Sequence, residues 1–420
     1  MKLTIIGAGS PYTSELIEKI SQEQDALSVQ EICLMDIDER KLDIMHGYCT
    51  RFGKRLGLRA EITKTTDRHR ALDGCTYVNP QIRVGGNQAR VNDEKIPLAR
   101  GLIGQETTGA GGFTKGLRTI PVMLDIAHDM EKYCPDAWII NYTNPTGLVT
   151  EAVTKYSKVK IAGLCSGGFH ARGVVAKAMD VQPEQIRYDL FGLNHLSYAY
   201  NIKIDGKLLS EEQFEKVAES TGEDDRELIR LFNAIPIGYL HYYYHTSAKL
   251  KYLSEEKLSR GEQVLAMEEE LFSAFGDPNC DIRPPVLDKR GGGGYADVAV
   301  SSIKAIQLNV DTWLPANVPN KGTVCFLPED AVIETMCTVN ASGYHPLAIS
   351  TPPNAVWGLV CAVKNYEQLA VEAAVSGCRQ TALQALTAHP LVRDYDTAKV
   401  LLPELLEANK MYLPNFFRNT

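Results

Sequence analysis

Residues 2–20 read KLTIIGAGSPYTSELIEKI, an apolar run followed by the glycine turn GAG at 7–9 and an amphipathic segment. This pattern predicts a buried strand at 2–6, a tight turn and then a helix. Such a unit is typical of dinucleotide sites, because the bare backbone lets a pyrophosphate approach the helix N-terminus. Tyr12 occupies the place of the third glycine of the usual fingerprint, so a plain strand-to-helix turn is the alternative interpretation.

Strands and helices alternate through the first 170 residues. We expect strands in the apolar runs that follow the glycine turn, at 31–38, 60–67, 76–84, 137–145 and 159–165. Apolar residues at three- and four-residue spacing predict a long helix at 115–134. The alternation indicates an α/β fold whose N-terminal domain, residues 1–170, is a Rossmann-like doubly wound parallel sheet. With the glycine turn at 7–9, this domain is the predicted NAD-binding domain.

The pattern changes after residue 170. We expect strands at 187–204, 322–326 and 331–339, and helices near 211–233, 256–275, 296–307, 354–387 and 394–410. This mixture predicts a C-terminal α+β domain, residues 171–420. Since no low-complexity linker separates the two parts, we expect them to pack as one body with a cleft between them.

Composition restricts the class of protein. The formal net charge of -8 disfavours a nucleic-acid partner, because binding a phosphate backbone needs a basic face. No apolar run approaches the roughly 18 residues of a membrane span, and the start MKLTIIGAG lacks a secretory pattern. The ten cysteines include no C-x-x-C pair, which fits reduced thiols. We therefore expect a cytoplasmic protein without nucleic-acid or membrane partners.

More specific motifs follow one another along almost the whole chain. They are RVNDEKIPL (90–98), GLIGQETTGAGGF (101–113), LRTIPV (117–122), NYTNPTGLVTEAV (141–153), GLC (163–165), GLNHLS (192–197), GYLHYYY (238–244), SRGEQV (259–264), KRGGGGY (289–295) and VPNKGTVCFLPEDAVIE (318–334). In this order they resemble glycoside hydrolase family 4, and especially its 6-phospho-β-glucosidases.

The resemblance implies hydrolysis of a 6-phosphorylated, β-linked glucoside by oxidation, elimination, addition and reduction, in place of the usual pair of carboxylates. In this scheme NAD takes hydride from carbon 3 of the sugar, and a base removes the proton on carbon 2. A divalent metal ion, usually Mn²⁺, stabilises the enediolate. The held NADH finally reduces carbon 3 again, so the cofactor is not consumed. The family also implies a homodimer or homotetramer, and it assigns catalysis and oligomerisation to the C-terminal domain, residues 171–420.

Three residues match the family's chemical centre. The resemblance makes Cys165 and His195 metal ligands and Tyr239 the base at carbon 2. A single thiolate on Mn²⁺ is unusual, and it requires oxygens of the sugar and water to complete the shell. The alternatives are a buried apolar thiol, a hydrogen-bonded core histidine and an aromatic cluster that packs the cleft.

Five further residues are candidates for substrate contact or catalysis. Arg90, Asn92 and Asn144 correspond to sugar-contacting positions. Arg260 is the predicted phosphate ligand, because a guanidinium binds phosphate bidentately, although an exposed arginine at a helix start is the alternative. Glu106 is a candidate for acid assistance or for orienting a water, and equally for capping its glycine-rich loop. Lys289 and Arg290, before GGGG, are a possible second anion contact, or else flank a flexible loop.

The predicted cofactor residues lie at strand ends. Gly7, Gly9 and Ser10 form the first turn, and Asp36 ends the second strand, where a carboxylate accepts hydrogen bonds from the adenosine ribose and favours NAD over NADP. The predicted set also includes Asn141.

The loop after Cys165 departs from the family. It reads CSGGFH at 165–170, whereas the 6-phospho-β-glucosidases read Cys-Asn-(Ile/Val)-Pro and the 6-phospho-α-glucosidases Cys-Asp-Met-Pro. Ser166 is no strong acid, which disfavours a 6-phospho-α-glucoside, while an α-galactoside or a uronide stays open. The rival classes are an ordinary NAD-dependent dehydrogenase with net redox turnover and a non-catalytic sugar-phosphate sensor.

Overall fold

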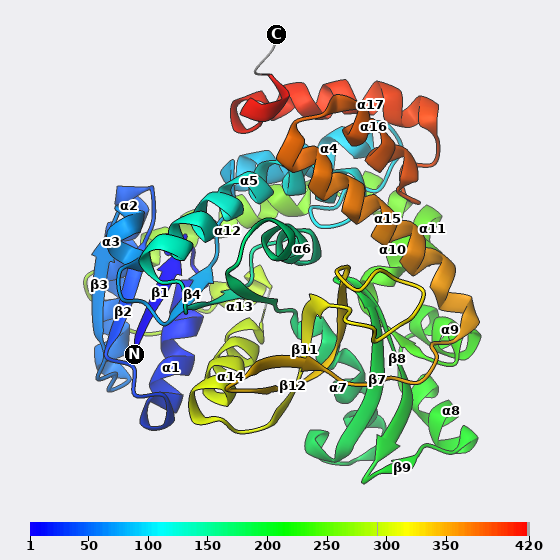
Figure 1. Cartoon of the computed structure of the whole chain (residues 1–420), viewed down its shortest axis with the longest axis horizontal. Helices are drawn as coiled ribbons and strands as arrows, with labels where there is room; N and C mark the ends of the chain where they lie inside the picture. Colours follow the sequence, from blue (N-terminus) through cyan, green and yellow to red (C-terminus); the bar gives the residue numbers. More distant parts are fainter. Residues whose placement is uncertain (292, 418–420) are drawn as a thin grey trace.

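The computed structural model describes residues 1–291 and 293–417. Its N-terminal half alternates strands and helices as the sequence predicts (Figure 1). The strands are β1 (Lys2–Ile6), β2 (Glu31–Met35), β3 (Glu61–Thr65), β4 (Tyr77–Pro80), β5 (Trp138–Asn141) and β6 (Lys160–Gly163). The helices between them are α1 (Thr13–Leu27), α2 (Glu39–Arg55), α3 (Arg68–Leu72), α4 (Gly86–Ala99), α5 (Gly109–Tyr133) and α6 (Thr146–Tyr156).

These six strands pair in parallel in the order β3-β2-β1-β4-β5-β6. This is the doubly wound order of a dinucleotide-binding sheet, so the predicted fold class is confirmed. The two faces of the sheet are buried against different helices. Ile32 and Leu34 of β2 belong to the cluster with α1 and α2, while Cys33 and Met35 belong to the cluster with α5 and α6, as the two-residue period of a strand requires.

The C-terminal half adds strands to the same sheet. They are β7 (Ile186–Leu193), β8 (Leu196–Ile204), β9 (Lys207–Leu208), β10 (Ile235–Pro236), β11 (Thr312–Pro319), β12 (Val332–Asn340) and β13 (Gly343–Pro346). β11 pairs with β6 through Asn317 and Gly163, and β12 pairs with both β11 and β7, all antiparallel. One mixed sheet therefore continues across the predicted boundary at residue 170, where α7 (His170–Met179) begins.

Ten further α-helices complete the described part of the second half. They are α8 (Glu211–Glu219), α9 (Glu223–Phe232), α10 (His241–Tyr244), α11 (Thr246–Glu255), α12 (Arg260–Gly276), α13 (Val286–Arg290), α14 (Tyr295–Leu308), α15 (Asn354–Ser376), α16 (Arg379–Ala388) and α17 (Tyr395–Ala408). None of the helices in the two described segments has the length and hydropathy needed to span a bilayer.

Two sequence expectations about the second half are wrong. The strand expected at 322–326 is a turn, because the side chain of Asn320 donates to the carbonyls of Val324 and Leu327 at 2.9 and 3.0 Å. The partner of β12 is β11, whose two prolines argue against a strand on sequence grounds. The helix expected at 354–387 ends at Gly377, which has φ +71° and lies where a Cβ would meet the Asn415 carbonyl oxygen at 2.3 Å.

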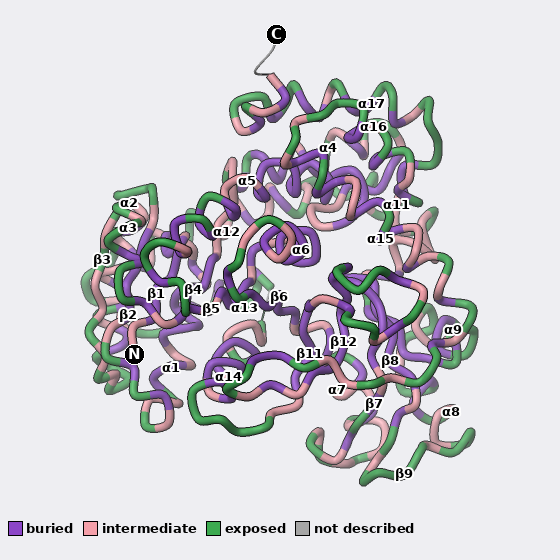
Figure 2. The backbone as a smooth tube through the Cα atoms, viewed as in Figure 1, coloured by how far each residue is buried: buried purple, intermediate pink, exposed green. Residues whose placement is uncertain are grey.

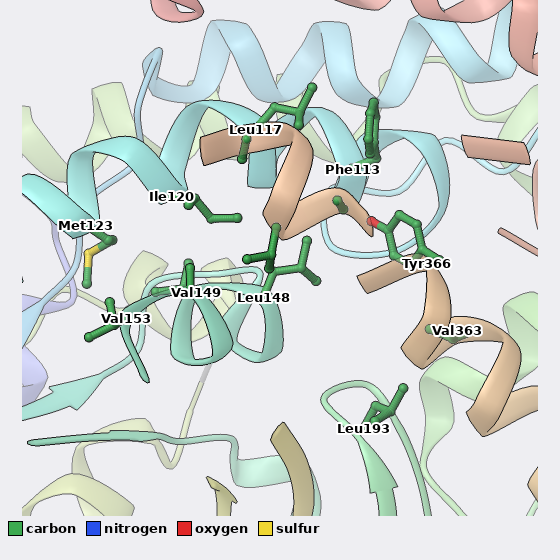
Figure 3. Packing of buried hydrophobic residues seen from close by; sticks show 14 of the residues in the cluster. Phe113, Leu117, Ile120, Met123, Leu148, Val149, Val153, Leu193, Val363 and Tyr366 are labelled. Atoms are coloured by element: carbon green, nitrogen blue, oxygen red, sulfur yellow. The ribbon is translucent and has the colours of Figure 1, made fainter. Parts of the chain in front are cut away.

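Helix α5 is the centre of the larger core. Figure 3 shows Phe113, Leu117, Ile120 and Met123 of this helix packed against Leu148, Val149 and Val153 of α6 and against Val363 and Tyr366 of α15. The tube in Figure 2 is accordingly buried along most of α5 and α6. Each such side chain contributes about 1.5–3 kcal/mol when fully buried. This packing fixes α5, whose first turns carry residues of the site described next.

Candidate active-site cleft

A cleft of about 1250 Å³ lies at the carboxyl ends of the parallel strands. Its lining includes Gly7 after β1, Asp36 after β2, Gln81 after β4, Tyr142 after β5 and Cys165 after β6. Ligands of open α/β sheets bind at this edge. The cleft is therefore the candidate site for both cofactor and substrate.

The glycine turn lies at one end of the cleft. Gly7 has φ +86°, and a Cβ there would meet the backbone carbon of Gln81 at 2.9 Å, so only glycine fits. The Gly9 amide donates to Oδ2 of Asp36 at 2.7 Å, and Ser10 lines the same wall. Ile37 is 90 % exposed beside them. The structure thus brings together the four predicted cofactor residues of the first two strand ends.

Two predicted contacts lie outside the cleft. Asn141 is fully buried, and its side chain is used within its own turn, where Nδ2 donates to the Thr143 carbonyl and Oδ1 accepts from the Thr143 amide. Asn92 is a residue of α4, two positions after Arg90 and so about 200° around the helix. Arg90 lines the cleft and Asn92 does not. The sequence pattern had not revealed α4, and Asn87, one turn before Arg90, lines the cleft instead.

Cys165, His195 and Tyr239 line the same cleft. Cys165 follows β6, His195 lies in the β7–β8 turn with φ +65°, and Tyr239 lies in the short 3-10 helix Gly238–Leu240. The His195 and Tyr239 rings stack with centroids 3.9 Å apart and an interplanar angle of 4°. Three residues that are 30 and more positions apart in sequence therefore form one group.

The donor set fits a divalent metal ion. Burial lowers the pKa of His195 to about 3, so its imidazole is neutral and has a lone pair to donate. Burial raises the pKa of the Cys165 thiol, and the carboxylate of Glu334 raises it further; a bound cation reverses this, since a coordinating thiol loses its proton. The described residues offer no group of three or more histidine, cysteine, aspartate or glutamate ligands. Cys165 and His195 could thus supply two ligands, with the other positions left to oxygens of the sugar and water.

A buried carboxylate joins the strands that carry these two residues. Glu334 of β12 accepts from the Ser197 hydroxyl at 2.6 Å and from Nδ2 of Asn317 at 3.3 Å, and the same Nδ2 donates to the Gly163 carbonyl at 3.3 Å. Burial raises the pKa of Glu334 to about 7. This network connects β6 to β8, and it was not predicted because its partners are distant in sequence.

The aromatic cluster around Tyr239 divides between cleft and core. The Tyr243 hydroxyl bonds the Thr108 hydroxyl at 2.6 Å and the Tyr244 hydroxyl bonds that of Tyr198 at 2.5 Å, so both point away from the site. Tyr239 and Tyr242 line the cleft. Burial raises the pKa of Tyr239, as do the charges of Cys165 and Glu106, while Arg90 lowers it. Positive charge is what this phenol needs to act as a base.

Glu106 is surrounded by cations. It forms ion pairs with Arg83, with Arg90 at 3.0 Å and with Lys115 at 2.8 Å. Burial would raise its pKa, but these three charges hold the pKa well below its usual range. The acid role considered for Glu106 therefore disagrees with its surroundings, because the group stays ionised. It orients the three cations along the cleft wall.

The arginine best placed for an anion is Arg290 rather than Arg260. Arg290 is 8 % exposed, stacks over the Tyr12 ring at 4.2 Å, and has Nε and Nη1 buried without a hydrogen-bond partner in the described chain. Arg260 is exposed and donates to the carbonyls of Lys289 and Arg290 at 3.0 and 2.9 Å. Arg260 thus holds the loop that presents Arg290. Gly292 of the GGGG motif lies outside the described residues.

The unusual loop after Cys165 is tightly packed. A Cβ on Gly167 would meet Cδ1 of Ile237 at 2.2 Å, and one on Gly168 would meet Cβ of Pro315 at 2.3 Å. The two glycines are therefore needed for the 3-10 turn Ser166–Phe169 to lie against β11. Ser166 lines the cleft, as does Asn144.

Comparisons with known proteins agree with this geometry. The model of the family 4 glycosyl hydrolases matches residues 2–181, and that of their C-terminal domain matches residues 190–392. A Bacillus subtilis protein named "Probable 6-phospho-beta-glucosidase" is 41 % identical over 99 % of this chain and 98 % of its own length. The structure of the 6-phospho-beta glucosidase from Thermotoga maritima with NAD and glucose-6-phosphate superposes with a TM-score of 0.92, at 33 % identity over 98 % of this chain and 99 % of that one. A second form of it, with manganese, NAD⁺ and glucose-6-phosphate, has a TM-score of 0.90 at 32 % identity, with the same coverage.

Proposed function

Because the chain belongs to family 4 of the glycosyl hydrolases, we propose that it hydrolyses β-linked 6-phosphoglucosides with NAD and a divalent metal ion, with Mn²⁺ as the candidate. One observation carries this proposal. A single cleft holds the glycine turn with Asp36, the Cys165–His195–Tyr239 group and the unpartnered guanidinium of Arg290. The names of the similar proteins and the ligands of the Thermotoga structures support it.

Two groups would complete this site. Cys165 and His195 would hold the metal ion, while Gly7, Gly9, Ser10 and Asp36 would hold NAD. When bound, NAD supplies a reversible hydride acceptor for carbon 3 of the sugar and the ion supplies positive charge beside its hydroxyl oxygens.

The chain's own residues provide binding and proton transfer. Arg290 would bind the 6-phosphate, because a buried guanidinium with free N–H groups matches phosphate oxygens bidentately. Tyr239 would take the proton from carbon 2 on its phenolic oxygen, with Arg90 favouring the phenolate. Glu106 would remain a carboxylate and keep Arg83, Arg90 and Lys115 in place around the sugar.

The β linkage is proposed because position 166 offers no acid. A serine hydroxyl does not protonate a poor leaving group as the aspartate of the α-specific pattern does. The Ser166 side chain lies beside Gly294, where a Cβ would meet Cβ of Ser166 at 3.5 Å.

A substrate panel tests this function. Purified protein with NAD and Mn²⁺ is given α- and β-linked 6-phosphoglucosides and their unphosphorylated counterparts, and both free sugar and NADH are measured. We expect cleavage of the phosphorylated β-glucosides, dependence on added NAD and no net NADH at completion. NADH formed in proportion to product would instead identify a dehydrogenase, and a preference for neutral or α-linked sugars would overturn the substrate assignment.

A further inference from the structure

Thr107 is in direct contact with His195. It lies in the segment between α4 and α5, within the GQETTG sequence, and its Oγ1 is 2.9 Å from Nδ1 of His195. No part of the proposed reaction uses this hydroxyl. The contact matters because a neutral histidine has one N–H and one lone pair, and the hydrogen bond at one nitrogen decides which nitrogen can bind a metal ion.

Gln105 determines the direction of the Thr107 hydroxyl. Its Oε1 accepts from the amides of Thr107 and Thr108 at 2.5 and 2.9 Å, and lies 2.8 Å from Thr107 Oγ1. Backbone N–H groups only donate, so the side-chain atom between them is the carbonyl oxygen and not the amide nitrogen. An oxygen of this kind has no proton. The short contact to Thr107 therefore requires the threonine hydroxyl to donate its one proton to Gln105.

This direction fixes the tautomer of His195. Since the Thr107 proton points at Gln105, the oxygen can only accept from the imidazole, and Nδ1 must carry the ring proton. The lone pair is then on Nε2, for which no hydrogen bond occurs among residues 1–291 and 293–417. We propose that Gln105 and Thr107 are positioning residues that hold His195 as the tautomer with a free Nε2 lone pair, ready for a divalent metal ion. This inference rests on the proposed function of the cleft.

The fold holds this chain of hydrogen bonds rigidly. At Gly111 a Cβ would meet the main-chain carbonyl oxygen of Gln105 at 2.2 Å, and at Gly112 it would meet the main-chain carbonyl carbon of Thr107 at 2.5 Å. The glycines of GAGGF thus let the Gln105–Thr107 segment lie directly on α5. The backbone that carries the Gln105 and Thr107 side chains is therefore held in place against the helix.

Metal affinity tests the proposal with matched variants. Thr107→Val keeps the shape and removes the hydroxyl, Thr107→Ser restores it, and Thr108→Val removes the neighbouring hydroxyl that bonds Tyr243. Binding of Mn²⁺ to each NAD-free protein is measured from the EPR signal of the free ion, and folding is checked by thermal unfolding. Loss of such a partner typically weakens metal binding about 10–100-fold. We expect that loss for Thr107→Val alone, with Thr107→Ser and Thr108→Val close to wild type.

The tautomer itself is measured without metal. In ¹⁵N NMR of the chelator-treated wild type, assigned with His195→Gln, we expect a protonated Nδ1 and an unprotonated Nε2 near neutral pH, and a mixture of tautomers in Thr107→Val. A wild type with its proton on Nε2 overturns the proposal, as does a folded Thr107→Val that binds Mn²⁺ like wild type. If the wild type has the expected tautomer but binds no Mn²⁺, the metal role of the proposed function fails while the tautomer assignment stands.

Discussion

Replacing Arg290 by methionine should weaken the binding of phosphorylated substrates and, at the same time, stabilise the free protein against unfolding. Arg290 is almost fully buried, and two of its nitrogens have no partner in the described residues. An unpaired buried charge is costly, and its replacement by an apolar group of similar volume can stabilise a fold by about 1–4 kcal/mol. The lost stack on Tyr12 offsets about 0.5–2 kcal/mol of that gain. The free energy of unfolding should therefore rise modestly.

The same substitution should change substrate binding by more than it changes the free energy of unfolding. Removing one partner from a buried charged pair costs about 2–5 kcal/mol, which at about 1.4 kcal/mol per tenfold corresponds to roughly 30-fold to several thousand-fold in affinity. The assay compares kcat/KM for a 6-phospho-β-glucoside and for its unphosphorylated analogue, which should hardly respond. Arg260→Met should lower kcat/KM for the phosphorylated sugar by less, because the Arg260 guanidinium already donates to the main-chain carbonyls of Lys289 and Arg290.

A matched control exists outside the cleft. Arg172 also stacks on aromatic rings, those of Phe169 and Trp313, and also has a buried Nε without a partner. Arg172→Met should leave catalysis unchanged. The reasoning is refuted if Arg290→Met keeps the wild-type kcat/KM for the phosphorylated sugar or lowers stability. If NAD affinity falls instead of substrate affinity, Arg290 binds the cofactor's pyrophosphate.

Three further outcomes are expected. Cys165→Ser, like chelation of the wild type, should abolish hydrolysis and Mn²⁺ binding while NAD binding persists; full activity of this variant in chelator-treated buffer would contradict the ligand assignment. Wild-type turnover in D₂O should place deuterium at carbon 2 of the product, and Tyr239→Phe should slow turnover by about 10²–10⁴-fold; a product without deuterium at carbon 2 would speak against a base that exchanges with solvent. Asp36→Ala should weaken NAD binding roughly 10- to 150-fold, because a hydrogen bond to a charged group contributes about 1.5–3 kcal/mol. Glu39→Ala, on the neighbouring helix turn, should leave NAD binding unchanged. Titration with NAD, followed by protein fluorescence, measures both affinities.

Local patterns predicted what depends on local geometry. The turn at Gly7 and Gly9 and the acidic end of β2 were foreseen because a strand, a bare turn and a helix are encoded within 20 consecutive residues. Cys165, His195 and Tyr239 could be brought together only through the resemblance, since no spacing connects a strand end, a hairpin turn and a 3-10 helix. Their actual proximity follows from the pairing of β6, β11, β12 and β7.

Three predicted site residues make contacts that the sequence does not reveal. Asn92 was assigned to the sugar from the resemblance, and in α4, which the sequence pattern did not reveal, it lies about 200° around the helix from Arg90. Asn141 was assigned to the cofactor although its amide satisfies the Thr143 backbone. Arg260 was preferred to Arg290 because nothing in SRGEQV shows that its guanidinium is used by two carbonyls of another segment.

The fold separates the groups proposed to do chemistry from Arg290, the group proposed to bind the phosphate of the substrate. Cys165, His195 and the glycine turn are attached to hydrogen-bonded strands of one continuous sheet, so their mutual positions are fixed by the backbone ladder. Arg290 ends the short helix α13, and side-chain contacts with Tyr12 and Arg260 help to hold its loop over the cleft. Changes between 285 and 295 should consequently alter KM and substrate choice at nearly constant kcat, whereas changes at the strand ends should alter kcat. A family built on this frame can change the sugar that it binds without rebuilding the centre that reacts.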